Sequence, residues 1–204
     1  FLHAFQLYRE SLRSSLRVVL DRFAVADVAR KVVGVGSVGT RCYVVLLLGI
    51  DGNDPLFLQV KEAEESVLER HLPKSVYPNA GRRVVVGQRI MQAASDMFLG
   101  WTVGPEGRHF YIRQLRDMKG SARAERLNTV EALSTYGALC AWTLARGHAC
   151  SGDHVVIAGY LGDGLEFSDA VGRFAIAYAE QNERDYDEFV RAIKNGRLFA
   201  TPGY

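Results

Sequence analysis

The sequence has 204 residues, of which 48% are hydrophobic and 24% charged, so it describes an ordinary globular protein and excludes a disordered chain. Its net charge of +2 and its dispersed basic residues also argue against a nucleic-acid-binding protein. The longest apolar run, residues 43–48, is far too short to cross a lipid bilayer, so a membrane-spanning protein is not expected.

The first predicted elements are a helix and the strands that follow it. Residues 5–23 have an amphipathic pattern, with four apolar side chains on one side at helical spacing: Leu12, Leu16, Val19 and Phe23. The character then changes to β-branched runs separated by glycine turns. Strands are predicted at residues 28–36, 40–49 and 56–61, with a turn at residues 51–55 before the last of them.

Two helices and a hairpin come next. A short helix is predicted at residues 62–71, followed by a polar loop to about Arg82. A longer helix is predicted at residues 84–97, where Val86, Ile90, Ala93 and Met97 recur at helical spacing. The motif GPEGR at residues 104–108 lies between two strand-forming segments, which indicates a β-hairpin.

Only helices are predicted after Met118. Asn128 and Glu131 have the spacing of a capping box for a helix that runs to about Ala149. Its inward side chains are expected to be Val130, Leu133, Gly137, Cys140 and Leu144. Two further helices are predicted at roughly 166–180 and 183–195, the second ending at Gly196 as the residue after its cap.

This order of elements predicts an α+β fold with two lobes. An N-terminal helix (residues 1–24) precedes a lobe (residues 25–118) with an antiparallel sheet of about five strands plus helices, and an all-helical lobe (residues 119–204) follows. The polar segment 116–123 would form the boundary. A protein kinase has the same order of small lobe, hinge and large lobe.

The segment GVGSVG raises two alternatives for its glycines. Gly34, Gly36 and Gly39 match the G-x-G-x-x-G motif of a Rossmann unit and of a kinase phosphate loop. A Rossmann motif must open a helix, whereas residues 40–48 here are rich in strand formers. The context therefore favours a strand–loop–strand, in which Ser37 and the glycines would let backbone N–H groups approach the phosphates of a nucleotide.

A lysine and a glutamate complete the predicted nucleotide site. Lys61 ends the apolar strand FLQVK, as the phosphate-binding lysine of a kinase does. A carboxylate should hold that lysine, and Glu69 is the chosen candidate in the predicted helix 62–71. The hinge, near the adenine, is predicted to comprise Gln114, Arg116, Asp117 and Met118. A solvent-exposed lysine and an acidic helix face are the alternatives to this site.

Five separated blocks of the sequence carry a family resemblance: KVVGVGSVGTRCYVVLL, DPLFLQVKEA, VVVGQRIMQAASDMFLGWT, FYIRQLRDMKGS, and LARGHACSGD with IAGYLG after it. In this order they resemble the bacterial uncharacterised family called domain of unknown function 2252, over nearly the whole chain. The resemblance implies a protein-kinase-like fold near the small-molecule phosphotransferases, with ATP and Mg²⁺ as candidate cofactors that folding does not require.

The resemblance also implies a missing part. Members of that family are longer and carry the catalytic-loop motif G-D-x-H-x-x-N-F and metal-binding aspartates upstream of the glycine loop. The nearest string here, GHACSGDH, lacks the following Asn, so His148 is expected to be a core or helix-end residue and Asp153 a loop or cap residue. The chain is therefore expected to be the C-terminal half, to bind its N-terminal half, and to show no ATP turnover alone. No catalytic residue or metal site is predicted within it.

A different class of function fits the same pattern. The chain could be a non-catalytic interaction or regulatory module that keeps only the kinase-like fold, with exposed apolar surface that also supports oligomers. Three cysteines, odd in number and without metal-ligand spacing, indicate reduced thiols and a cytoplasmic protein: Cys42, Cys140 and Cys150.

Overall fold

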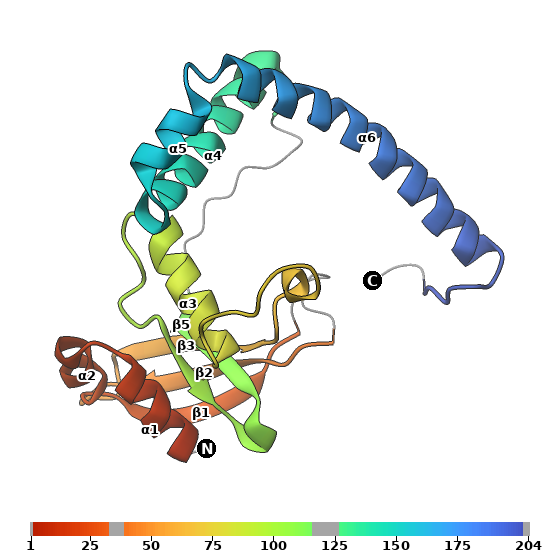
Figure 1. The fold of residues 1–204 in the computed structure, drawn as a ribbon. Coiled ribbons are helices and arrows are strands. Elements are labelled where there is room, and N and C mark those ends of the chain that lie inside the picture. The colour runs from red at the N-terminus through yellow and green to blue at the C-terminus, as the bar shows by residue number, and fades with distance from the viewer. Residues whose placement is uncertain (1, 33–38, 116–126, 202–204) are drawn as a thin grey trace. The chain divides into compact units, whose positions relative to one another are not determined.

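The structure is a computed structural model that describes residues 2–32, 39–115 and 127–201. It divides into two compact units, residues 1–151 and 152–204. The first contains the sheet and the helices α1 to α4, and the second contains α5 and α6 (Figure 1). The segment predicted as the boundary between lobes, residues 116–123, lies outside the described residues.

The predicted antiparallel sheet of about five strands is confirmed. Its strands are β1 (Ala24–Arg30), β2 (Cys42–Leu48), β3 (Pro55–Ala63), β4 (Gly100–Val103) and β5 (His109–Gln114). The spatial order is β1-β2-β3-β5-β4, and every neighbouring pair is antiparallel. The predicted hairpin closes β4 onto β5 through the 3₁₀ turn η3 (Pro105–Gly107), where the Gly104 amide donates to the Arg108 carbonyl at 2.8 Å.

The predicted N-terminal helix is two helices, α1 (Leu2–Ser11) and α2 (Ser14–Leu20). The chain breaks at Arg13, which is extended at φ −61° and ψ 146°. Arg17 stabilises this break, because its guanidinium donates to the carbonyls of Leu12 and Glu10 at 3.0 and 2.6 Å. Orphan carbonyls at the end of α1 thereby gain partners.

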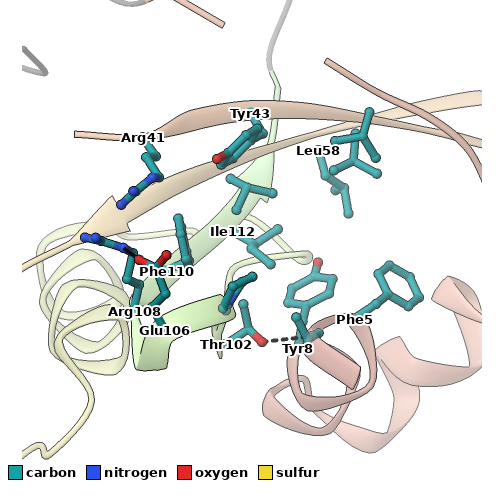
Figure 2. A pocket seen from close by; sticks show the side chains of 16 residues that line it. Phe5, Tyr8, Arg41, Tyr43, Leu58, Thr102, Glu106, Arg108, Phe110 and Ile112 are labelled. Atoms are coloured by element: carbon teal, nitrogen blue, oxygen red, sulfur yellow. Dashed lines mark hydrogen bonds and ion pairs between the residues drawn. The ribbon is translucent and has the colours of Figure 1, made fainter. Parts of the chain in front are cut away.

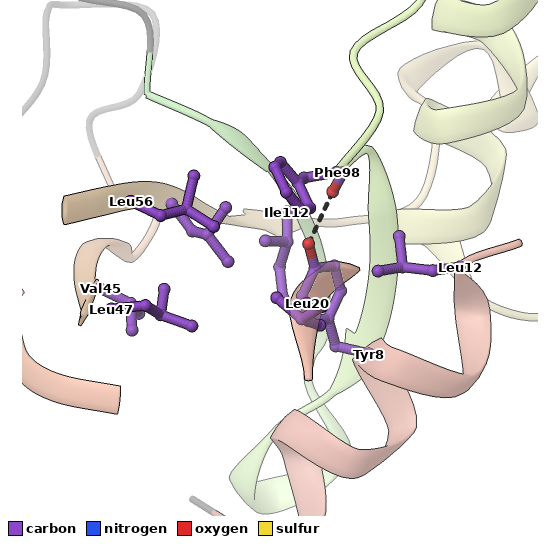
Figure 3. Close-up of a cluster of buried hydrophobic side chains, with 9 residues drawn as sticks. Tyr8, Leu12, Leu20, Val45, Leu47, Leu56, Phe98 and Ile112 are labelled. Atoms are coloured by element: carbon purple, nitrogen blue, oxygen red, sulfur yellow. Dashed lines mark hydrogen bonds between the residues drawn. The ribbon is translucent and has the colours of Figure 1, made fainter. Parts of the chain in front are cut away.

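The core lies between these helices and one face of the sheet (Figure 3). Tyr8 of α1 and Leu12, the residue after α1, pack with strand residues that include Leu47 and Leu58. The Tyr8 side chain is completely buried, and its hydroxyl donates to the Phe98 carbonyl at 2.7 Å. The predicted apolar side of this segment faces the core, with Leu12, Leu16, Val19 and Phe23 packed there.

The helix predicted at residues 62–71 is wrong. Strand β3 continues to Ala63, because the Glu62 amide donates to the Arg41 carbonyl at 2.9 Å and stays in the ladder. Only a 3₁₀ turn, η2 (Val67–Arg70), follows. Glu62 therefore lies in a strand and Glu69 in this turn.

Helix α3 (Ala80–Met91) begins four residues before the predicted start. The Asn79 side chain caps it by accepting from the Arg82 amide at 2.9 Å. Val85 is its fully buried residue, while Ala93 and Met97 follow the helix and are exposed. Asn79, which directly follows Pro78, is an N-cap residue and was the overlooked sequence signal for the start of this helix.

Helix α4 (Val130–Ser151) confirms the predicted long helix, with a different cap and a different inward face. The Thr129 hydroxyl, not Asn128, accepts from the Ala132 amide at 3.1 Å. The predicted inward residues Leu133 and Leu144 are more than half exposed. The helix instead packs at its end, where Arg146 donates to the Ile90 carbonyl of α3 at 3.0 Å.

The second unit comprises α5 (His154–Leu161) and α6 (Leu165–Lys194). A single helix replaces the two predicted at 166–180 and 183–195, and pairs of polar side chains four residues apart, such as Gln181 with Asp185, stabilise its middle. Its predicted end is confirmed, since Gly196 is left-handed at φ 71° and the Arg197 amide bonds the Ala192 carbonyl. No helix in the described ranges is both long and apolar enough to span a membrane.

Candidate functional site

The connection between β1 and β2 excludes a Rossmann unit. The two strands are antiparallel neighbours, and the Lys31 amide donates to the Cys42 carbonyl at 2.9 Å. Gly39 is left-handed at φ 86°, and β2 begins three residues later instead of a helix. The glycine motif therefore lies between two paired strands, as predicted from its context. Gly34, Gly36 and Ser37 lie outside the described residues.

Lys61 lies in the central strand β3, close to this connection. Its residue partners across the ladder are Cys42, the first residue of β2, and Tyr111 of β5. Side chains alternate along a strand, so Gln59 and Lys61 share the face opposite to that of Leu58 and the core. The lysine is partly buried and has no ion pair or hydrogen bond with any residue that the structure describes.

The groups around Lys61 are polar and cationic. Gln59 is 4% exposed, and its side-chain oxygen accepts from the Arg113 guanidinium at 3.1 and 3.3 Å. Its amide also contacts the Cys42 sulfur at 3.7 Å. Burial raises the pKa of the Tyr111 phenol, although the nearby Arg113 opposes that shift. The face therefore carries two cationic side chains around a buried amide.

Glu69, the carboxylate predicted to hold Lys61, does not form that ion pair. Glu69 instead closes the capping box of η2, accepting from the Ser66 amide at 3.3 Å. Glu62 adjoins Lys61 in the chain but points to the other face of β3, as the next residue of a strand must. The first turn of helix α3 lies against the Lys61 face of the sheet, where the backbone amide of Ala80 donates to the His109 ring.

Glu62 forms ion pairs with two arginines on the face of the sheet opposite Lys61. Its side chain is 4% exposed and accepts from the Arg41 amide at 2.9 Å. It also accepts from the guanidinium groups of Arg41 at 3.4 Å and Arg108 at 3.0 Å. Burial by itself favours the neutral acid, but the Arg41 amide and the Arg108 and Arg41 charges outweigh it and lower the pKa of Glu62.

A cavity that the sequence did not predict lies beside this charged cluster. It occupies about 300 Å³ between α1 and the core face of the sheet, and Phe5 and Tyr8 form one wall (Figure 2). Arg41 and Arg108 lie at one end of it. An alternation of apolar residues in strands predicts a buried face but not a void, so no sequence signal marked this site.

A family model described as an uncharacterized protein conserved in bacteria (DUF2252) matches residues 2–192. The chain belongs to the DUF2252 family. The match includes the whole described sheet and almost all of α6. No curated protein and no solved structure matches the sequence. The resemblance carried by the five sequence blocks is thus confirmed for the family itself.

The predicted hinge of this DUF2252 protein is described only at its first residue. Gln114 is the last residue of β5 and is exposed, and its amide donates to the Asp96 carboxylate at 2.6 Å. Arg116, Asp117 and Met118 lie outside the described residues. Asp96 also accepts from the Phe98 amide at 2.8 Å, so it ties the end of β5 to the loop before β4.

The string GHACSGDH of the DUF2252 chain forms two helix ends. Asp153 caps α5, and one of its carboxylate oxygens accepts from the amides of Val155 and Val156, both at 3.0 Å. Its prediction as a loop or cap residue is confirmed. His148 lies exposed in the last turn of α4, as a helix-end residue and not a core one. Within residues 2–32, 39–115 and 127–201, no three His, Cys, Asp or Glu side chains gather as a metal site requires.

Proposed function

We propose that this protein binds the phosphates of a nucleotide on the sheet face that carries Lys61, as the small lobe of a kinase-like phosphotransferase does. The observation that carries the proposal is the environment of Lys61. The residue is partly buried, and no carboxylate of the described chain pairs with its ammonium group. An ammonium group without a carboxylate partner can attract an anionic ligand, and phosphate oxygens are strong acceptors of its hydrogen bonds.

The position of Lys61 in the sheet supports the same function. A phosphate-binding flap needs two antiparallel strands joined by a glycine-containing turn, and a lysine on the next strand. Here β1 and β2 pair through a connection that ends with the left-handed Gly39, and β3 brings Lys61 opposite the start of β2. Arg113 on the same face adds a second cation, and its hydrogen bonds to Gln59 hold it in place.

The catalytic base and the Mg²⁺ ligands that phosphoryl transfer requires would come from another segment of the full-length protein. Transfer needs a base and oxygen ligands for Mg²⁺, and the family resemblance implies that these precede the glycine loop in longer members. We therefore propose that the chain binds Mg·ATP weakly and that a further segment of the full-length protein supplies the catalytic carboxylates. General-base and electrostatic contributions are each worth several orders of magnitude in rate, so a phosphate cradle alone does not turn ATP over.

Calorimetric titration with Mg·ATP tests the binding. Lys61→Met keeps most of the aliphatic stem and removes the charge, and Lys74→Met is the matched control at an exposed lysine. We expect Lys61→Met to weaken binding by about tenfold or more, the value of one charge-assisted hydrogen bond. Equal affinities for the native protein and both variants would contradict the proposal.

A phosphate-release assay tests the assignment of catalysis to another segment. We expect no turnover above background for the native chain or for Asp153→Asn, because Asp153 only caps α5. Turnover that the variant abolishes would make GHACSGD a catalytic loop and overturn the assignment.

A second candidate function rests on helix α4. Several of its large apolar side chains are more than half exposed: Leu133, Leu139, Trp142 and Leu144. Exposed apolar residues in this number are typical of a surface that another protein covers. In this alternative the kinase-like fold serves only for interaction with another protein segment, and Mg·ATP has no effect on stability.

A further inference from the structure

We propose that the cavity between α1 and the sheet binds a small amphipathic molecule, with a carboxylate at one end and a hydrocarbon chain of medium length. This site lies on the face of the sheet opposite Lys61 and does not depend on nucleotide binding. The proposal rests on three features of the cavity: its dry walls, its size and the hydrogen-bond donors at its end.

The walls of the cavity are hydrocarbon. Phe5 and Tyr8 of α1 face Leu58 and Ile112 of the sheet across it (Figure 2). Two of the hydroxyl groups in the wall already have partners inside the protein. The Tyr8 hydroxyl donates to the Phe98 carbonyl, and the Thr102 hydroxyl donates to a carbonyl of α1. A polar ligand would therefore find few groups to bond along the walls, whereas a hydrocarbon loses water on entering.

The size of the cavity limits the hydrocarbon. An apolar cavity of about 150 Å³ holds one benzene molecule. This cavity measures about 300 Å³. It matches a flexible chain of about ten carbons, roughly twice the size of benzene.

The end of the cavity supplies donors for an anion. Arg41 and Arg108 point toward one another there, and their side chains are 37% and 39% exposed. Their partner Glu62 is 4% exposed and accepts from both guanidinium groups and from the Arg41 amide, so its acceptor capacity is largely used. Among the described residues, Arg108 donates only from Nε and Nη1 and Arg41 only from Nη1, so most of the guanidinium N–H groups have no partner there.

The charges of this cluster decide how an anion would be held. Glu62 and Glu106 balance the two arginines, so no net positive field attracts the ligand from a distance. Glu106 is 68% exposed and bonds Arg108 at one edge only, at 2.9 Å. A carboxylate would then bind by geometry, because a guanidinium fork fits two carboxylate oxygens, whereas an ammonium head would lie beside the like charges of Arg41 and Arg108.

Titration of the protein with decanoate, below the concentration at which decanoate forms micelles, tests the site. Val28→Trp and Val60→Phe each add bulk to a residue that lines the cavity, and Val25→Trp is the matched control on β1 outside the lining. We expect saturable binding of decanoate to the native protein and to Val25→Trp. Each filling variant should lower the affinity about tenfold or more while far-ultraviolet circular dichroism shows that it is folded. Two filling variants on different strands keep the test valid if one of them does not fold.

The head group is tested separately. Arg108→Gln and Arg41→Gln should each weaken decanoate about tenfold and leave decanol unchanged, while Arg22→Gln, an exposed arginine outside the site, should change neither. Decanol or decylammonium that binds as tightly as decanoate would overturn the assignment of the carboxylate end. Absence of saturable binding, or affinities that no filling variant lowers, would overturn the site itself.

Discussion

The two faces of the sheet differ in how they treat their charged and polar groups. On the α1 face, Glu62 accepts hydrogen bonds from two arginines and Tyr8 bonds a buried carbonyl, so these groups contribute to stability. On the other face, the side chain of Lys61, the adjacent residue of the same strand, has no hydrogen bond or ion pair within the described chain. Alternation along one strand thus separates a charge that is paired within the fold from one whose side chain has no partner among the described residues.

Tyr8→Ala should have the largest effect on stability, because it empties the centre of the α1 face. The side chain is 0% exposed, and its loss leaves a cavity and an unpaired Phe98 carbonyl. We expect the free energy of unfolding to fall by about 3–5 kcal/mol in urea titrations. Val18→Ala, at an exposed position of α2, serves as the control and should change it by less than about 0.5 kcal/mol. A small loss for Tyr8→Ala would mean that this face is not the core.

Glu62→Gln should cost about 2–3 kcal/mol, since it leaves the hydrogen bonds from Arg41 and Arg108 without a charged acceptor. The pKa of Glu62 is lowered in the folded protein, so the stabilisation is present above the unfolded pKa and is lost as pH falls through the folded value. Urea titrations at a series of acidic pH values should show this loss in the native protein. The variant should lack that component, and identical pH profiles would contradict the assignment of Glu62 as a structural charge.

Gln59→Leu should have a smaller effect on the Lys61 face. It removes the acceptor of two N–H groups of Arg113 and the contact with the Cys42 sulfur, while it keeps the buried volume. We expect a loss of about 1 kcal/mol in thermal unfolding. A loss as large as that of Glu62→Gln would remove the difference between the two faces.

The sequence predicted the elements whose signals are local. The strand segments have alternating or continuous apolar residues between turn residues, and the cap at Gly196 needs only one glycine. Both signals could therefore be recognised without knowledge of the fold. The helix predicted at residues 62–71 failed because the spacing of its glutamates ignored the pairing of β3 with β2 and β5, which keeps Glu62 extended. The inward face of α4 failed because apolar spacing does not reveal whether a partner is present to cover it.

The candidate site could be predicted only in part. Lys61 could be proposed from the sequence because a lysine at the end of an apolar segment after a glycine turn is a local pattern, whereas Glu69 does not form the predicted pair with it. That pairing depended on Glu69 lying in a helix, whereas it caps a 3₁₀ turn. The arginine cluster around Glu62 joins residues 41, 62 and 108, which only the sheet brings together.

The urea unfolding of Lys61→Met, with and without Mg·ATP, tests the difference between the faces most directly. Without nucleotide we expect its free energy of unfolding to lie within about 0.5 kcal/mol of the native value, because Lys61 has no partner to lose in the described chain. At a nucleotide concentration 100 times the Kd of the native protein, the native protein should gain about 2.7 kcal/mol. The variant should gain much less at that same concentration. Equal gains for the two proteins, or a variant destabilised without nucleotide as strongly as Glu62→Gln, would contradict the claim that Lys61 is held for a ligand.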